Sequence, residues 1–467
     1  MATYIALLPV AFLFIALASV GALTQHIHAE LALDLEASRI ISTLVVTGRP
    51  TNCTCADPQH CKPVVGERDK EFFGFIWPAS KNFRQFNWTR LSSIAWLEDP
   101  ELVCLAHSHA ARVILNSGDV KDCLQPGAGA LRLSWVATHV QRVLDLGLDG
   151  INFDHEAPMR PGDSSVRAYA HLVALTARVI KAVSPGAQVS VDVPWSPFDV
   201  DGRNYDWPAL TAAADLLFVM AYDTQSQIWG RCVASANSPL PLIARGLQQW
   251  LDLGTPPGKM VLGLPWYGYD YPCVSLLQPP HAPAAAAAAV PTPTAAAAAR
   301  QLHGTAAADT AVRSTAGALA PRQQQQQELR GGWRADGGPA ASSQIPVCLL
   351  RPVPFTGALC SDAAGWQHPF MDLLHLLDTE DSVTEVMWDE LGSASTFTYF
   401  NKQDNLPHQV WFDTPQSLLP HYQLAHRLGL RGIGCWNLEM LYSTDPGADK
   451  PDARAAMWQA VEDGFFA

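Results

Sequence analysis

Short apolar runs rich in β-branched and aromatic residues recur along this chain, and longer amphipathic stretches separate them. Apolar residues follow helical spacing most clearly over residues 131–146 and 165–183. Strands that alternate with helices form parallel units with right-handed crossovers, so the pattern predicts an α/β fold, a (β/α)8 TIM barrel. The eight predicted strands are residues 72–77, 94–97, 112–116, 150–156, 188–195, 216–223, 260–269 and 433–437.

Two segments interrupt this alternation. Residues 396–413 lie between the seventh and eighth predicted strands and contain two short β-type runs, which predict a small β excursion. Residues 279–343 consist of alanine runs, a glutamine run and glycine pairs with little to pack, so we expect disorder or a frayed helix. Because a longer loop costs stability only logarithmically, we interpret this segment as a tolerated insertion. A lid role is the alternative.

Composition and charge narrow the class of protein. The chain has 467 residues, 48% hydrophobic and 16% charged, which suits one or two globular domains with a substantial core. Its formal net charge of −13 argues against nucleic acid and anionic membranes as partners and fits a neutral ligand.

Ten cysteines indicate an oxidising compartment, although their connectivity cannot be deduced from sequence. Cys273 and Cys348 flank the low-complexity segment, and a bridge between them would close its base. Cys53, Cys55 and Cys61 lack the second half of a zinc pattern, so we expect disulfides there and no metal site.

The N-terminal residues indicate a secreted or lumenal protein. Residues 5–23 are apolar, and we interpret 1–23 as a cleaved signal peptide, with no membrane association after cleavage. The usual positive charges before the apolar run are missing, so a membrane helix or a leader reaching about residue 49 are alternatives. Asn52 and Asn87 begin N-glycosylation acceptor sequences, which are used only in the secretory pathway.

The most informative segment is residues 149–156, Asp-Gly-Ile-Asn-Phe-Asp-His-Glu, at the end of the fourth predicted strand. Alternate side chains of a strand share a face, so Asn152, Asp154 and Glu156 are expected to point inward. Crowded, buried carboxylates raise one another's pKa, which leaves a protonated acid beside an ionised neighbour. Glycoside cleavage needs that arrangement. A half-exposed strand end that happens to be acidic is the alternative interpretation.

Further polar and aromatic residues fall at the ends of other predicted strands. Barrel enzymes place their active sites at the C-terminal ends of the strands. The residues at such ends are Tyr222, Asp223, Tyr267 and Trp436. The pattern therefore predicts one site built from several strands.

The acidic segment resembles the active-site strand of family 18 glycoside hydrolases, Asp-x-x-Asp-x-Asp-x-Glu. Three of its four acidic positions match, as Asp149, Asp154 and Glu156, while Asn152 replaces the second Asp. That departure is a signature of one branch of the family. Further ordered segments resemble the same branch over roughly residues 50–445, apart from the insertion. The resemblance makes the excursion at 396–413 a small α+β insert beside the sugar site.

The resemblance implies a retaining, substrate-assisted mechanism, in which the 2-acetamido oxygen of the substrate attacks the anomeric carbon. Glu156 would donate a proton to the leaving oxygen and then act as base for water. Asp154 would hold the acetamide N–H, and Tyr222 would bond the acetamide oxygen. Asp149 would sit behind Asp154 and exchange a hydrogen bond with it.

The resemblance also implies the ligand. The expected activity is hydrolysis of the β1,4 bond of N,N′-diacetylchitobiose, a small oligosaccharide, by a monomer without metal or organic cofactor, in a lysosome or vacuole or outside the cell. An endo-acting chitinase or endo-β-N-acetylglucosaminidase, or a non-catalytic chitin-binding lectin, are the alternatives. Such lectins lose the acid that Glu156 supplies here. Expected substrate-binding residues are Trp436, Asn152, Asp223, Tyr267 and Trp266.

Overall fold

The structure of the protein is a computed structural model. It describes residues 27–47, 50, 53–66, 68–77, 80–198, 200–224, 232–278, 345–356, 358–443, 445 and 447–467. The expected signal peptide at 1–23 and the low-complexity insertion at 279–343 lie outside these residues, so both stay predictions. Among the described residues, every helix is too short or too polar to span a bilayer.

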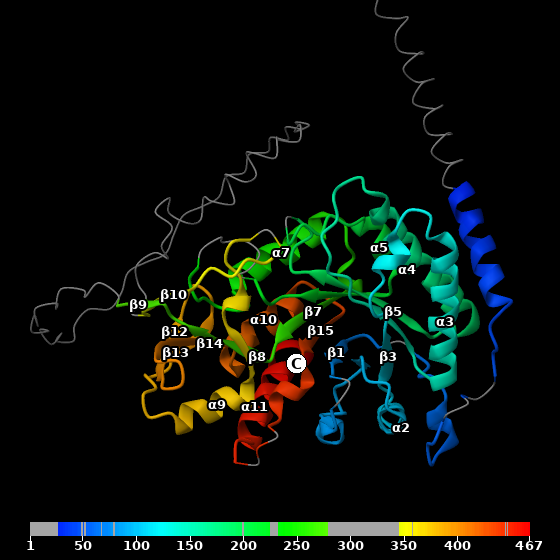
Figure 1. Cartoon of the computed structure of the whole chain (residues 1–467). Coiled ribbons are helices and arrows are strands. Elements are labelled where there is room, and N and C mark those ends of the chain that lie inside the picture. Colours follow the sequence, from blue (N-terminus) through cyan, green and yellow to red (C-terminus); the bar gives the residue numbers. More distant parts are fainter. Residues whose placement is uncertain are drawn as a thin grey trace, which may run out of the picture. The chain divides into compact units, whose positions relative to one another are not determined.

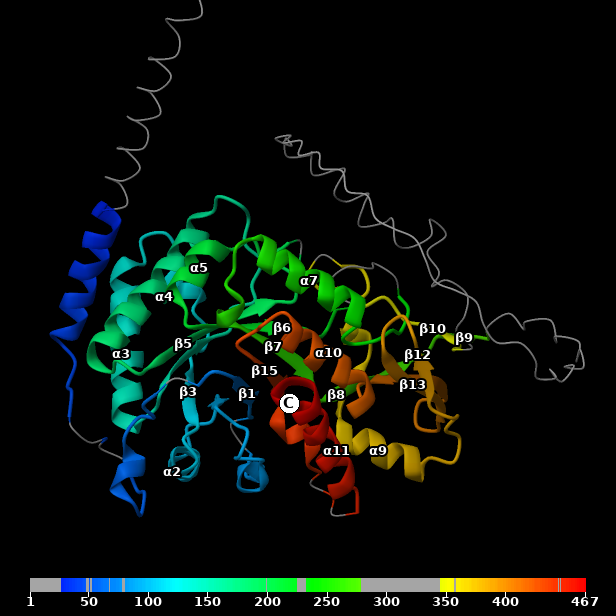
Figure 2. The ribbon, with the colours of Figure 1, turned by 180° about the vertical axis from the view of Figure 1, so that it is seen from behind.

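Eight parallel strands close into a barrel in the order β1-β15-β7-β6-β5-β4-β3-β2 (Figures 1 and 2). The predicted barrel and all eight of its strands are confirmed. Several predicted runs were too long. β4 ends at Phe153 and β6 at Met220, and the seventh run divides at Trp266 into the barrel strand β7 and a further strand, β8 (Tyr267–Pro272). The strands are β1 (Glu71–Phe75), β2 (Ser93–Ala95), β3 (Arg112–Asn116), β4 (Gly150–Phe153), β5 (Gln188–Pro194), β6 (Leu216–Met220), β7 (Met260–Pro265) and β15 (Gly432–Trp436).

Helices connect the strands and surround the barrel (Figure 1). Both predicted helices are confirmed, as α3 (Gly129–Leu146) and α4 (Ser164–Val183). Gly147 ends α3 in the left-handed conformation at φ 67°, which glycine adopts without a Cβ penalty. The others are α2 (Pro100–Ser108), α5 (Trp207–Ala213), α7 (Leu240–Asp252), α9 (Phe370–Thr379), α10 (Pro415–Arg427) and α11 (Pro451–Val461).

Aromatic and aliphatic side chains fill the barrel interior beneath the strand ends. Phe73 and Phe75 stack with their ring centroids 5.1 Å apart, and Phe218 meets both edge-on. Ile114 and Val261 belong to the same buried cluster. The interior is therefore a packed core, which leaves only its C-terminal rim for chemistry.

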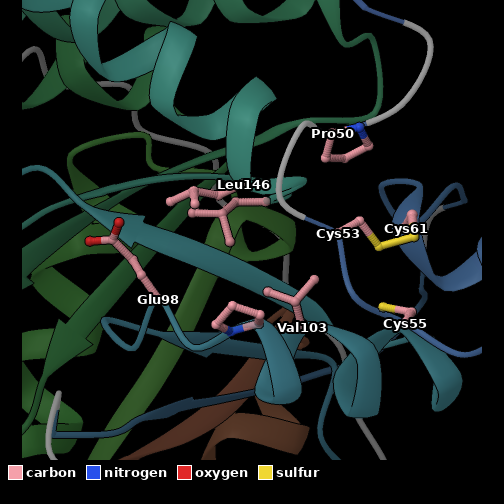
Figure 3. Close-up of a pocket in the computed structure, with 9 residues that line it drawn as sticks. Pro50, Cys53, Cys55, Cys61, Glu98, Val103 and Leu146 are labelled. Carbon is pink, nitrogen blue, oxygen red and sulfur yellow. A yellow bond between two sulfur atoms is a disulfide. The ribbon is translucent and has the colours of Figure 1, made fainter.

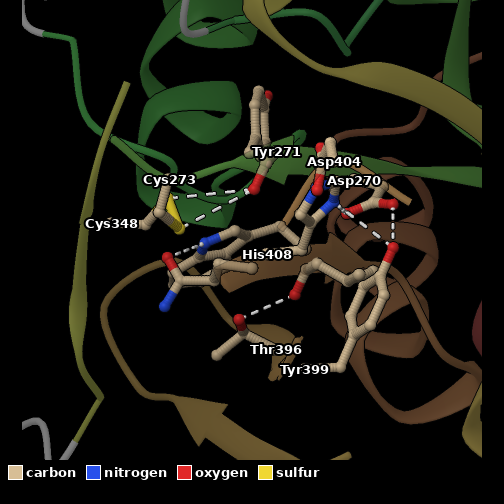
Figure 4. Close-up of a disulfide and its surroundings, with 11 residues drawn as sticks. Asp270, Tyr271, Cys273, Cys348, Thr396, Tyr399, Asp404 and His408 are labelled. Carbon is tan, nitrogen blue, oxygen red and sulfur yellow. Dashed lines mark hydrogen bonds and ion pairs between the residues drawn. A yellow bond between two sulfur atoms is a disulfide. The ribbon is translucent and has the colours of Figure 1, made fainter. Parts of the chain in front are cut away.

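A five-stranded antiparallel sheet, in the order β11-β8-β14-β13-β12, forms the expected insert before the last barrel strand. His408 lies in it between two carboxylates, 2.8 Å from Asp270 and 2.8 Å from Asp404, and Tyr399 donates to Asp270 (Figure 4). Burial lowers the pKa of His408, but the two carboxylates outweigh it and raise the pKa. The strands are β8 (Tyr267–Pro272), β11 (Trp366–Pro369), β12 (Met387–Asp389), β13 (Ala394–Asn401) and β14 (Leu406–Phe412).

Eight of the ten cysteines form four disulfides, and Cys123 and Cys435 are free and buried. The predicted bridge between Cys273 and Cys348 is confirmed, and it ties together the two sides of the chain from which residues 279–343 depart (Figure 4). β9 (Ser275–Leu277) and β10 (Val347–Leu349) pair beside it. The remaining bridges are Cys53–Cys61, Cys55–Cys104 and Cys232–Cys360.

A small pocket lies beside two of these bridges. Cys53, Cys55 and Cys61 line it together with Val103 of α2 and Leu146 of α3 (Figure 3). The three sulfur atoms lie within 4.8 Å of one another because the two disulfides are neighbours. Sulfurs engaged in disulfides are not the thiolates that bind zinc, so these three cysteines do not offer a zinc-binding set.

A helix formed by residues 27–41 packs on the outside of α4. Arg178 of α4 pairs with Glu30 at 2.5 Å and with Asp34 at 2.9 Å, while Leu33 and Ile40 are buried. A leader that reached residue 49 would therefore include this helix, which packs against α4. The position of signal cleavage stays a prediction.

Candidate active site

Asp154 and Glu156 lie directly after β4, at the C-terminal rim of the barrel. Glu156 reaches solvent, with its side chain 49% exposed. Asp154 is more enclosed, and its Oδ1 is buried without a hydrogen-bond partner among the described residues. Burial and the neighbouring Glu156 raise the pKa of Asp154 to about 7, although Arg203 opposes this shift. Asp154 therefore holds its proton to a higher pH than an ordinary aspartate does.

Arg203 supplies the positive charge of the site from the loop between β5 and α5. Its guanidinium is buried, with the side chain 5% exposed, and forms ion pairs with Glu156 and, at 3.1 Å, with Asp201. Burial lowers the pKa of Arg203, but the surrounding carboxylates outweigh it, so the group stays charged. Arg203 therefore fixes the resting position of the Glu156 side chain.

Asn152 supports the site from within the barrel wall. Its amide oxygen accepts from the Trp96 indole at 2.9 Å, and its amide nitrogen donates to Ser190 at 3.1 Å and to Asp192 at 2.8 Å. Because the side chain is completely buried and both N–H groups have partners, the expectation that Asn152 binds substrate is wrong.

Asp149 lies at the opposite end of the barrel. It precedes β4 whereas Asp154 follows it, and five extended residues span about 16 Å. Its carboxylate accepts from the backbone N–H groups of Val64 and Val113 and bonds His107 at 2.8 Å. The expected hydrogen bond between Asp149 and Asp154 is therefore wrong, and Asp149 instead ties the N-terminal segment to the barrel.

Tyr222 and Asp223 follow β6 on the same rim. Burial and the charges of Asp192 and Asp154 raise the pKa of Tyr222 well above its ordinary value, so its hydroxyl stays protonated and able to donate. Asp223 accepts from the hydroxyls of Tyr267 and, at 2.9 Å, Tyr269. This pairing places Tyr267 beside the predicted acetamide-binding residues.

The two predicted sugar-binding tryptophans have different surroundings. Trp436 ends β15 at the rim, with ring centroids 5.5 Å from Phe75 and 5.0 Å from Trp96, above the packed core. Trp266 points outward from the barrel, 1% exposed, and packs on Trp458 of α11. A substrate-binding role for Trp266 is therefore wrong, because alternation along the chain turns it toward the helix layer.

Sequence reasoning missed three residues of this site: Asp192, Arg203 and Trp96. Asp192 had a signal, because Gln188, Ser190 and Asp192 are polar residues that alternate with valines along the predicted strand. Arg203 stands in a loop, and no pattern in the sequence indicated it. Trp96 is one residue past β2 with a left-handed φ of 89°, which sequence does not reveal.

Two neighbouring carboxyl groups on the C-terminal rim of a (β/α)8 barrel, with a cluster of aromatic rings beside them, are the arrangement expected of a glycoside hydrolase. Residues 124–440 match Glycosyl hydrolases family 18, and the chain belongs to this family. It is 32% identical to the di-N-acetylchitobiase of Rattus norvegicus, over 88% of this chain and 92% of that protein. The di-N-acetylchitobiase of Homo sapiens is 31% identical over 88% of this chain and 89% of that protein.

Solved structures with the same fold are more distant in sequence. A chitinase from Chromobacterium violaceum aligns with a TM-score of 0.53 at 16% identity, over 85% of this chain and 98% of that one. A class V chitinase from Nicotiana tobaccum, solved as a point mutant in complex with NAG4, gives a TM-score of 0.55 at 12% identity, over 85% and 99% of the two chains. At these identities the likeness supports the fold.

Proposed function

We propose that the protein hydrolyses the β1,4 bond of N,N′-diacetylchitobiose with retention of configuration, by a substrate-assisted mechanism. Membership of family 18, the similarity to di-N-acetylchitobiases and the position of Glu156 at the barrel rim support this activity. The four disulfides support an oxidising compartment such as a lysosome, a vacuole or the extracellular space. A monomer remains our expectation.

The buried Oδ1 of Asp154 is the observation that carries the proposed mechanism. A buried carboxylate oxygen without a partner requires a donor, and the acetamide N–H of the substrate is one. Donation to Asp154 favours its ionised form, so the proton that Asp154 carries in the free protein moves to Glu156. This transfer also requires the Glu156 carboxyl to leave its ion pair with Arg203.

The bond-breaking step then follows from the positions of the side chains. The acetamide oxygen attacks the anomeric carbon while the glycosidic bond breaks, and the leaving oxygen takes the proton of Glu156. Ionised Asp154 offsets the positive charge of the cyclic intermediate, and Tyr222 bonds the acetamide oxygen. Glu156 next removes a proton from water, which attacks the same carbon from the face the leaving group occupied. The net result is retention.

The test compares purified protein acting on N,N′-diacetylchitobiose and on the same sugar with its reducing end blocked. We propose that the enzyme requires a free reducing end, so we expect cleavage of the free disaccharide and little cleavage of the blocked one. Equal cleavage of both, or action on long chitin alone, would instead indicate an endo-acting chitinase. Binding without cleavage would indicate a lectin.

Dependence on the acetamide gives a separate prediction. Cellobiose should be inert, because it lacks the group that Asp154 and Tyr222 are proposed to hold. A thiazoline analogue of N-acetylglucosamine should inhibit, since it mimics the cyclic intermediate and such mimics bind more tightly than substrate. Cleavage of cellobiose at a comparable rate would show that the acetamide is not the nucleophile. A covalent glycosyl ester trapped on Asp154 would show that Asp154 is the nucleophile.

A further inference from the structure

Asp192 is a second buried carboxyl group beside the proposed acidic pair. It lies on β5, is 4% exposed, and its Oδ1 accepts from Asn152 Nδ2 at 2.8 Å. In the parallel pairing of β4 with β5, Phe153 is opposite Val191, so Asp154 comes opposite Asp192. Neighbouring strands lie about 4.8 Å apart, which brings the two carboxyl groups together at the rim of the barrel.

The chemistry of the neighbours fixes which oxygen of Asp192 is able to carry a proton. An indole N–H only donates, so the Asn152 oxygen must face Trp96 and the Asn152 amide nitrogen must face Asp192. The Oδ1 of Asp192 therefore receives a hydrogen from Asn152. A proton on Asp192 belongs on Oδ2, where it is free to be donated.

Electrostatic interactions favour a proton on Asp192. Burial and the charge of Asp154 raise the pKa of Asp192 well above its usual range, Glu156 adds to the effect, and the hydrogen bond from Asn152 opposes it. The other charged or titratable groups that act on the pair are Arg203 and the tyrosines Tyr169, Tyr205 and Tyr222. The pKa of each tyrosine is raised, so all three stay neutral. A carboxyl group kept neutral by such surroundings acts as a hydrogen-bond donor.

We propose that Asp192 is a positioning residue that remains a neutral carboxylic acid and donates from Oδ2 to Asp154 when Asp154 becomes ionised. This inference rests on the proposed glycosidase function. Asn152 is unable to take the role, because both of its amide hydrogens already have acceptors. A donor already oriented toward a charge that forms during the reaction stabilises that charge without reorganisation.

Two substitutions distinguish a neutral hydrogen-bond donor at position 192 from an ionised carboxylate at that position. Asp192→Asn keeps a neutral donor of the same shape, so kcat should stay within about 10-fold of wild type and the acid side of the pH–rate profile should not move. Asp192→Ala removes the donor, so kcat should fall about 10²-fold. The acid side should also move to higher pH, because ionised Asp154 loses a donor and its pKa rises.

Ser190→Ala is the matched control, since it removes the other acceptor of Asn152 and leaves the carboxyl groups in place. Its pH profile should coincide with that of wild type. The proposal would be overturned by equal losses of kcat in Asp192→Asn and Asp192→Ala, or by a pH–rate profile that does not move in Asp192→Ala. It would also be overturned if the acid side of the profile moved equally in Ser190→Ala.

An infrared difference spectrum between wild type and Asp192→Asn keeps the test independent of turnover and of the folding of the alanine variant. It should show the carbonyl band of a protonated carboxylic acid. An ionised carboxylate band would overturn the proposal. Wild-type protein that fails to cleave N,N′-diacetylchitobiose would count against the proposed function, while the infrared band would still report the state of Asp192.

Discussion

Glu156→Gln should lower kcat on N,N′-diacetylchitobiose by about 10²- to 10⁴-fold, because a glutamine amide has no proton to give the leaving oxygen. The substitution keeps the shape of the side chain, and this side chain is 49% exposed, so folding should be unaffected. Binding of the disaccharide should persist, since Asp154, Tyr222 and Trp436 remain. Steady-state kinetics, with titration calorimetry for binding, measure both quantities.

Asp163→Asn is a suitable control for this experiment. Asp163 is an exposed carboxylate a short distance along the same chain segment, at the start of α4, and its side chain makes no capping hydrogen bond there. Its replacement should leave kcat unchanged. If Glu156→Gln turned over at a near-normal rate, another group would have to be the acid.

Arg203→Met should destabilise the fold by about 3–5 kcal/mol, the usual cost of removing one partner from a buried ion pair. The Asp201 side chain is 2% exposed and loses its cation, whereas the half-exposed Glu156 contributes little to this cost. The free energy of unfolding from urea denaturation measures the effect.

The same variant should change the pH dependence of stability. Arg203 opposes the rise in the pKa of Asp154, so without it this pKa should rise above about 7. A folded-state pKa above the unfolded value means that the folded protein holds the proton more tightly, and stability falls as pH rises through that window. The destabilisation by Arg203→Met should therefore be larger at pH 8 than at pH 5, because pH 5 lies below and pH 8 above the pKa of about 7 that Asp154 has with Arg203 present.

The double variant Asp201→Asn with Arg203→Met separates the two effects. It removes the buried carboxylate that lost its cation, so most of the stability should return. The raised pKa of Asp154 should remain, because Asp201 does not cause it. A pH-independent destabilisation in Arg203→Met would show that its charge does not act on Asp154.

The barrel could be read from the sequence because its signals are local. Helical spacing over 131–146 and 165–183 and short apolar runs between them report which faces are buried, and the observed α3 and α4 begin within two residues of the predicted starts. Asp154 and Glu156 stand close together for the same reason, since a single residue separates them in one chain segment. Local sequence also located the β excursion that became β13 and β14.

Only the tertiary structure decided what surrounds that acidic pair. Periodicity shows that a side chain is buried but not which distant segment meets it, so Arg203 on Glu156 and Asp192 beside Asn152 had to come from the packed fold. The tertiary structure also decided where β4 ends. With only four residues in that strand, Asp149 falls at one end of the barrel and Asp154 at the other, and a shared motif becomes two separate sites.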